Sequence, residues 1–150
     1  MEERLVKVGI THGDINGIGY EVILKTLSDT RIAELCTPVI YGSSKIAAYH
    51  RKVLDLPAVN LSIIAQAEDA GANRVNIINC VDDETKVELC QSTTAAGEAA
   101  YLALEAAVTD LKRGAVDVLV TAPINKHNIQ NEQFHFPGHT EYLEQCFGGL

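Results

Sequence analysis

The sequence lacks several features that mark specialised classes of protein. Its four cysteines, at positions 36, 80, 90 and 146, form no C-x-x-C pair, so the spacing excludes a zinc knuckle or a thioredoxin-type motif and favours buried free thiols. No segment approaches the roughly 18 consecutive apolar residues that a membrane helix needs. The first residues lack the basic and long apolar regions of a signal peptide. We therefore expect a cytoplasmic protein with no membrane partner.

Basic residues are also scarce. The chain has 12 Lys and Arg against 20 Asp and Glu, which gives a formal net charge of -8. Because nucleic acid binding depends on Lys and Arg that neutralise phosphates, we expect no nucleic acid partner. Small anionic ligands are compatible with this charge, since a few oriented backbone N–H groups can hold a phosphate inside an acidic protein.

Strand and helix patterns alternate along the 150 residues, 47% of which are hydrophobic. Short β-rich runs occupy residues 4–11, 37–42, 60–65, 75–80 and 116–120, and a small edge strand is expected at 87–89. No repeat, low-complexity tract or Pro/Ser-rich linker interrupts them. The pattern predicts one α/β unit over residues 1–150 without an internal boundary.

Several element boundaries follow from capping chemistry. Ser43 is expected to cap a helix over 45–56, and one of residues 92–94 is expected to cap a longer helix that ends at Gly114. That helix carries a stripe of small side chains, which permits close packing on a sheet: Ala96, Ala99, Ala103 and Ala107. The apolar run Val116 to Val120 predicts a central strand buried on both faces of a mostly parallel sheet. Two short helices are expected, at 126–130 and from Thr140 onward. Because the chain stops three residues after the segment 141–147 that begins this second helix, we expect the sequence to be cut there.

The first loop of interest is the glycine-rich segment 11–21 (THGDINGIGYE), which follows a strand. Its glycines leave N–H groups bare at a helix N-terminus, where the helix dipole favours an anion. We assign Asp14, Gly17 and Gly19 to cofactor binding, although the spacing matches neither G-x-G-x-x-G nor a G-K-[ST] loop. A glycine-rich turn in which Asp14 or Asn16 caps the helix is the alternative.

The second loop of interest begins at 121–126 (TAPINK) and ends at 136–141 (FPGHTE). Pro123 ends the strand because it has no N–H to donate, which leaves Asn125 and Lys126 to face a ligand. Lys126 could act as a point charge on an anionic group, either a phosphate or a carboxylate. The alternative is that it is a solvated surface lysine. His139 and Thr140 place an imidazole and a hydroxyl side by side, as suits the gripping of a polar substrate. The alternative is that Thr140 is an N-cap beside an exposed His139.

The histidines do not predict a metal site within this sequence. His135 and His139 are four residues apart, but the Phe-Pro-Gly between them prevents a helical pair, and His127 adds no further ligand set. His12 and His50 are expected to be ordinary polar residues. No Ser-His-Asp triad or nucleophilic cysteine can be assembled, so no catalytic residue is assigned.

Five blocks of this sequence together resemble the 4-hydroxythreonine-4-phosphate dehydrogenase (PdxA) family of pyridoxal phosphate biosynthesis. They are residues 10–14, residues 17–19 with Glu21, the Ala-rich helix with Gly97, residues 121–126 and residues 137–141. The resemblance covers the whole chain but only the N-terminal part of the family pattern. The chain departs from that pattern at Ile15-Asn16 and Tyr20, where the family usually has Pro-Ala and Pro. These changes alter the stiffness of the first loop and put fine cofactor or substrate preference in question.

The resemblance implies a fold similar to that of isocitrate and isopropylmalate dehydrogenases, a three-layer α/β/α arrangement with a mostly parallel sheet, here incomplete. It implies oxidation of 4-phosphohydroxy-L-threonine by NAD or NADP, followed by decarboxylation, in a homodimer. His139 and Thr140 would bind substrate, and we add Asn125 and Lys126 from the loop argument. A divalent metal (Zn, Mg or Co) would be held by histidines that lie outside this chain. We therefore expect an N-terminal fragment that is inactive alone.

Two alternatives are kept beside this interpretation. One is a related dehydrogenase for a phosphorylated sugar acid, which would use the same His139 and Thr140. The other is a non-catalytic module that binds a phosphorylated metabolite, since no catalytic metal ligand set is visible in the sequence.

Overall fold

The computed structural model describes residues 4–148. Five strands form one sheet in the order β3-β4-β2-β1-β5, and every neighbouring pair is parallel. The strands are β1 (Lys7–Thr11), β2 (Thr37–Gly42), β3 (Leu61–Ile64), β4 (Val75–Asn79) and β5 (Val118–Thr121). A parallel sheet needs crossover segments on its faces, and these supply the helical layers.

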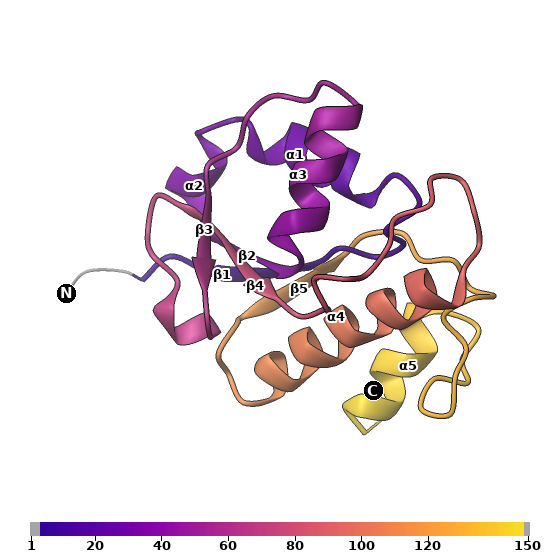
Figure 1. Ribbon diagram of the computed structural model, residues 1–150. Helices are drawn as coiled ribbons and strands as arrows, with labels where there is room; N and C mark the ends of the chain where they lie inside the picture. Colours follow the sequence, from indigo (N-terminus) through magenta and orange to yellow (C-terminus); the bar gives the residue numbers. More distant parts are fainter. Residues whose placement is uncertain (1–3, 149–150) are drawn as a thin grey trace.

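Helices cover both faces of the sheet (Figure 1). On one face lie α1 (Gly19–Leu27), α2 (Ile32–Leu35) and α3 (Ser44–Val53). On the other lies α4 (Thr94–Lys112), with α5 (His139–Cys146) packed beyond it and the short 3-10 turn η1 (Ala67–Asp69) beside it. The predicted α/β class, with helices on both sides of a parallel sheet, is confirmed. Among residues 4–148 there is no helix with the length and apolarity needed to cross a membrane.

Capping side chains set the starts of α3 and α4 as predicted. The Ser43 hydroxyl accepts a hydrogen bond from the Ile46 N–H, and the Thr93 hydroxyl accepts one from the Ala96 N–H. Gly114 follows α4 with a φ of 79°, a left-handed conformation typical of a helix C-terminus. The predicted stripe of small side chains on α4 is buried: Ala103 and Ala107 pack with residues of β2, while Ala96 and Ala99 belong to the cluster that holds Ile15 and Tyr20.

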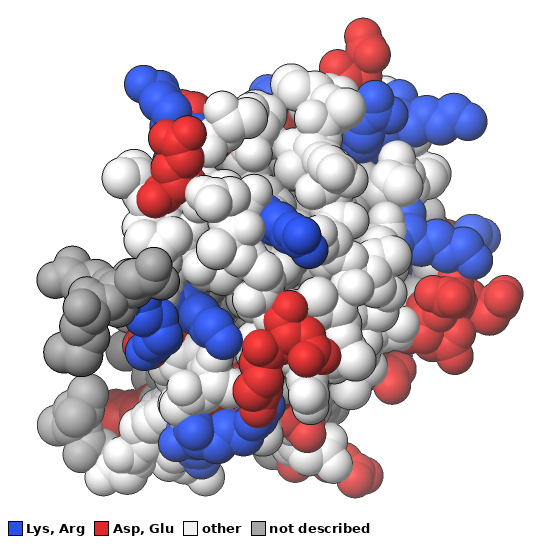
Figure 2. Space-filling model, turned by 90° about the vertical axis from the view of Figure 1, so that its left-hand side faces the viewer, with Lys and Arg blue, Asp and Glu red and all other residues white. Residues whose placement is uncertain are grey.

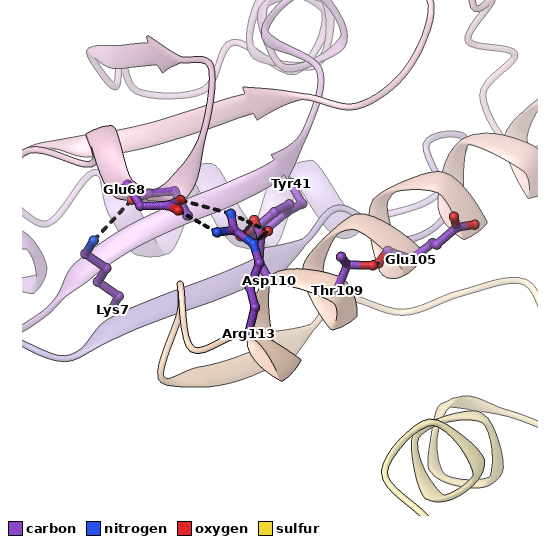
Figure 3. Close-up of polar contacts among 8 residues, drawn as sticks. Lys7, Tyr41, Glu68, Glu105, Thr109, Asp110 and Arg113 are labelled. Carbon is purple, nitrogen blue, oxygen red and sulfur yellow. Dashed lines mark hydrogen bonds and ion pairs between the residues drawn. The ribbon is translucent and has the colours of Figure 1, made fainter.

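A polar network ties α4 to the segment that carries η1 (Figure 3). The Tyr41 hydroxyl donates to Asp110 Oδ2 at 2.6 Å, and Arg113 Nε donates to Asp110 Oδ1 at 2.9 Å. Arg113 also pairs with Glu68 and holds the pKa of that carboxyl at about 2. Burial and the Asp110 carboxylate raise the pKa of Tyr41. The network therefore joins β2, α4 and η1 across one face of the sheet.

The structure differs from the sequence-based expectations in five places. The thiols expected to be buried are not: Cys36, Cys80 and Cys146 are partly exposed and Cys90 is exposed. The run Val116 to Val120 does not form a central strand: β5 lies at the edge of the sheet, and Val118 and Val120 are 45% and 51% exposed. An apolar run indicates that a strand is buried, but it does not predict whether the strand has a neighbour on one side or on both. Residues 87–89 form no strand: the Glu88 N–H donates to Asn16 Oδ1, and Val87 packs against the core as part of a loop. Residues 126–129 form a turn rather than a helix, and the last helix starts at His139, one residue earlier than expected.

Charged side chains of both signs are scattered over the face drawn in Figure 2, near its centre as well as at its rim. This side carries the amino-terminal ends of the strands, so it lies opposite the loops singled out above.

Candidate functional site

The two loops predicted to carry function lie side by side. Thr11 at the end of β1 pairs with Thr121 at the end of β5, so the loops that follow leave the same edge of the sheet. The Asp14 N–H donates to the Pro123 carbonyl at 2.9 Å. Gly13 has a φ of 66°, and a Cβ placed there would lie 2.2 Å from the Pro123 carbonyl oxygen. A glycine at position 13 is thus what lets the two loops touch.

The glycine-rich loop uses its own backbone groups internally. Asp14 Oδ1 accepts from the Asn16 N–H at 3.0 Å, and the Asp14 carbonyl accepts from the Gly17 N–H at 3.0 Å. These two amides therefore do not form an open cradle for a pyrophosphate, and the described conformation does not fit one through them. Gly19 is buried at the start of α1, while Ile18 beside it is 58% exposed.

Asn16 is a residue whose importance sequence reasoning missed. It is 3% exposed, and its side-chain amide donates to the Gln91 carbonyl and the Thr93 hydroxyl. Its Oδ1 accepts from the Glu88 N–H at 2.7 Å. Asn16 thus ties the glycine-rich loop to the residues that start α4. The sequence suggested Asn16 only as a possible cap of the following helix, but Ile18 occupies that N-cap position and no side chain caps α1. The actual partners of Asn16 lie more than seventy positions away in the sequence.

His12 and His50 are buried, and each forms hydrogen bonds within the chain. His12 Nε2 lies 2.9 Å from the Ala99 carbonyl, an acceptor, so this nitrogen carries the proton. Its Nδ1 then accepts from the Tyr20 hydroxyl at 2.7 Å. Burial lowers the pKa of His12 to about 4. The imidazole is therefore neutral at pH 7 and joins β1, α1 and α4.

Asn125 shapes the turn that carries Lys126. Its Oδ1 accepts from the N–H groups of His127 at 3.0 Å and Asn128 at 3.1 Å. That oxygen is engaged in the turn, so Asn125 can offer a ligand its amide N–H₂. Lys126 is exposed and takes part in no salt bridge with the residues that the structure describes.

His139 and Lys126 come together at the start of α5. A Cβ placed on Gly138 would lie 3.6 Å from Glu141 Oε2 and 3.8 Å from Lys126 Nζ, so a carboxylate also lies near this point. Burial, together with repulsion by Lys126, lowers the pKa of His139. His139 Nε2 is buried and has no hydrogen-bond partner within residues 4–148. Gly138, not Thr140, occupies the N-cap position, so the capping alternative for Thr140 is wrong and its side chain lies exposed in the first turn of α5.

These groups can hold an anionic, hydroxylated ligand. Lys126 supplies a positive charge, His139 an unpaired imidazole nitrogen and Thr140 a hydroxyl, next to the positive end of a helix dipole. His127 and His135 are exposed and do not join them. Within residues 4–148, no group of three or more His, Cys, Asp or Glu is placed to hold a metal.

A parallel α/β sheet with polar loops gathered at the carboxyl ends of its strands is typical of α/β proteins that bind metabolites there. Comparison with known proteins narrows this class. The family model described as pyridoxal phosphate biosynthetic protein PdxA matches residues 34–149. The chain belongs to the PdxA family.

Individual relatives agree with this assignment. The chain is 60% identical over 148 residues to a 4-hydroxythreonine-4-phosphate dehydrogenase of Bacteroides thetaiotaomicron, covering 99% of this chain and 40% of that protein. It is 31% identical to a Clostridium botulinum protein named for D-threonate 4-phosphate dehydrogenase activity, over 91% of this chain and 41% of that one. The crystal structure of a 4-hydroxythreonine-4-phosphate dehydrogenase from Burkholderia phymatum superposes with a TM-score of 0.85 at 28% identity, covering 98% of this chain and 45% of that chain. The chain thus spans about two fifths of the length of these curated relatives.

Proposed function

We propose that this chain forms the N-terminal part of an NAD(P)- and metal-dependent dehydrogenase that oxidises 4-phosphohydroxy-L-threonine, with decarboxylation of the product, in pyridoxal phosphate biosynthesis. The observation that carries the proposal is the 60% identity, over 99% of this chain, to a relative named for this reaction. The proposal also treats residues 1–150 as one α/β unit of a cytoplasmic homodimer, inactive without the remaining part of the enzyme.

The chain's own residues would bind and orient the substrate. Lys126 would neutralise the phosphate or the carboxylate as a point charge. Because its pKa is lowered, His139 would be neutral at pH 7 and could share a hydrogen bond with a substrate hydroxyl through its unpaired Nε2. Thr140 would add a second hydrogen bond, and the Asn125 amide N–H₂ a third.

The cofactors would supply hydride acceptance by NAD or NADP and polarisation of the hydroxyl by a divalent metal. The residues that the structure describes do not fit such a metal, so its ligands are proposed to lie outside this chain. We also propose that a dinucleotide contacts Asp14, Gly17 and Gly19. The N–H groups of Asn16 and Gly17 would not bind it, because both donate hydrogen bonds within the loop.

A phosphorylated sugar acid is the second candidate substrate, favoured by the 31% identity to the protein named for D-threonate 4-phosphate. This acid lacks the ammonium group of a hydroxy amino acid. A site built to pair with an ammonium rejects an analogue without it by a large factor, so relative kcat/KM values separate the two substrates.

A chimaera tests the proposal. This chain would replace the 148 matching residues of the Bacteroides thetaiotaomicron protein, and NAD reduction would be followed with both phosphorylated substrates and a divalent metal. We expect turnover of 4-phosphohydroxy-L-threonine, with kcat/KM at least about 100-fold above that for the sugar acid. We expect His139→Ala to lower kcat/KM by about 100-fold. A folded chimaera that oxidises neither substrate would contradict the proposed function.

Calorimetry on the 150-residue chain separates the remaining alternative, a non-catalytic binding module. A phosphorylated hydroxy acid that binds tightly to this chain alone, with loss in His139→Ala, would favour the module. Turnover by the chain alone would show that the catalytic groups lie within it, contrary to the proposal.

A further inference from the structure

Gly97 lies where the turn after β5 touches α4. It is a buried residue in the second turn of that helix. A Cβ placed on it would lie 1.8 Å from the Asn128 carbonyl oxygen and 3.1 Å from Asn128 Oδ1. Glycine costs about 1 kcal/mol relative to alanine inside a helix. A glycine in this alanine-rich helix therefore indicates a contact that alanine would prevent.

The turn that rests on Gly97 is the one that carries Lys126. Its far end is held by Ile129, which is fully buried and packs with Ala100 and Leu104 of α4. The Ile129 N–H donates to the Asn125 carbonyl at 3.2 Å and closes the turn. Lys126 thus lies in a short hydrogen-bonded turn that packs on α4.

Gln130 connects this turn to the approach to α5. Its Nε2 donates to the Lys126 carbonyl at 2.9 Å and to the Phe136 carbonyl at 2.8 Å. The Phe136 ring packs on Phe134 and Tyr142, with centroids 5.3 Å and 5.5 Å away. One side chain thus bridges the backbone of Lys126 and the backbone that leads into His139.

We propose that Gly97 and Gln130 are positioning residues that hold the Lys126 ammonium beside His139, Gly97 by seating the turn on α4 and Gln130 by bridging it to Phe136. The role of this arrangement in binding substrate rests on the proposed function, in which Lys126 and His139 contact substrate. The arrangement itself is independent of that function, because all its contacts lie within the chain.

Nuclear magnetic resonance titration of His139 tests the proposal without a ligand. The imidazole signal is assigned with His139→Gln and followed against pH in the 150-residue chain. Burial is the larger cause of the lowered pKa of His139 and the Lys126 ammonium is the smaller one, so Lys126→Met should raise that pKa while the effect of burial remains. Gly97→Ala and Gln130→Ala should raise it in the same direction and no further than Lys126→Met. Ala103→Gly is the matched control, because it weakens α4 by about 1 kcal/mol without touching the turn, and it should leave the pKa of His139 unchanged.

Two outcomes would overturn the proposal. One is an unchanged His139 titration in Gln130→Ala or in folded Gly97→Ala. The other is a Gly97→Ala chain that does not fold although Ala103→Gly does, because Gly97 would then serve the whole fold rather than this turn.

The chimaera separates this proposal from the proposed function. There Gly97→Ala and Gln130→Ala should raise KM for 4-phosphohydroxy-L-threonine about tenfold through misplacement of Lys126, while Ala103→Gly should leave KM unchanged. If the titrations shift as expected but the parent chimaera has no activity, the positioning stands and the assigned reaction fails.

Discussion

His12 makes the stability of this fold depend on pH. Its pKa is about 4 in the folded chain because of burial, against 6.5 for an unperturbed histidine. Below pH 6.5 the unfolded chain binds a proton that the folded chain does not, so the free energy of unfolding falls until about pH 4. We expect this residue to lower the free energy of unfolding by about 2 kcal/mol between pH 7 and pH 5. Urea unfolding at each pH would measure this change.

The control for this prediction is a histidine on the surface. His12→Gln removes the titrating group and should flatten the pH dependence, whatever it does to the absolute stability. His135 is exposed, and His135→Gln should keep the full slope. His50 and His139 also have lowered pKa values, so a smaller slope of the same sign should persist in His12→Gln. An equal slope in His12→Gln and the parent chain would count against the structural role of His12.

At the scale of the elements, a hydrogen bond from the Tyr41 hydroxyl adds a polar link to the apolar packing of β2 on α4 (Figure 3). Tyr41 is fully buried, and its hydrogen bond to the Asp110 carboxylate is 2.6 Å long. Hydrogen bonds to charged groups contribute about 2 kcal/mol, so Tyr41→Phe should lower the free energy of unfolding by about that amount in urea titrations. Tyr49 is 41% exposed, and Tyr49→Phe should change it by less than about 0.5 kcal/mol. Equal effects of the two substitutions would show that the buried bond contributes nothing.

Local chemistry predicted most elements of this fold. Ser43 and Thr93 cap the helices that their sequence contexts indicated, because a cap depends on residues only three positions apart. The place of β5 was predicted wrongly, because the number of neighbours of a strand is decided by segments far away in the sequence. The same limit explains why 126–130 appeared helical: Asn125 closes a single turn, and Gln130 then bonds to Phe136 instead of continuing a helix.

The candidate site was predictable where it depends on strand ends. The loops after β1 and β5 were each singled out from sequence, and the parallel pairing of Thr11 with Thr121 brings them together. The supporting residues were not predictable in this way. The need for glycine at position 97 comes from a contact with Asn128, thirty-one positions away. Nothing in the local sequence around Gly97 reveals that contact.

At the scale of the whole molecule, the surface around β5 is open. Within residues 4–148 this strand pairs with β1 alone, so its outer edge presents backbone groups without a neighbouring strand. Val118 and Val120 on this edge are about half exposed, as are Ile18 and Val22 at and after the start of α1. An apolar strand edge of this kind favours association with other chains.

We therefore expect the purified 150-residue chain to self-associate as its concentration rises, and light scattering after size-exclusion chromatography would measure this. The double substitution Val118→Lys and Val120→Lys places charge on the open edge and should shift the population to monomer, with little loss of stability because both side chains are about half exposed. Val53 is 50% exposed at the end of α3, so Val53→Lys adds charge elsewhere and should leave association unchanged. If the parent chain is a monodisperse monomer at high concentration and melts cooperatively, the open edge of β5 is not a site of association.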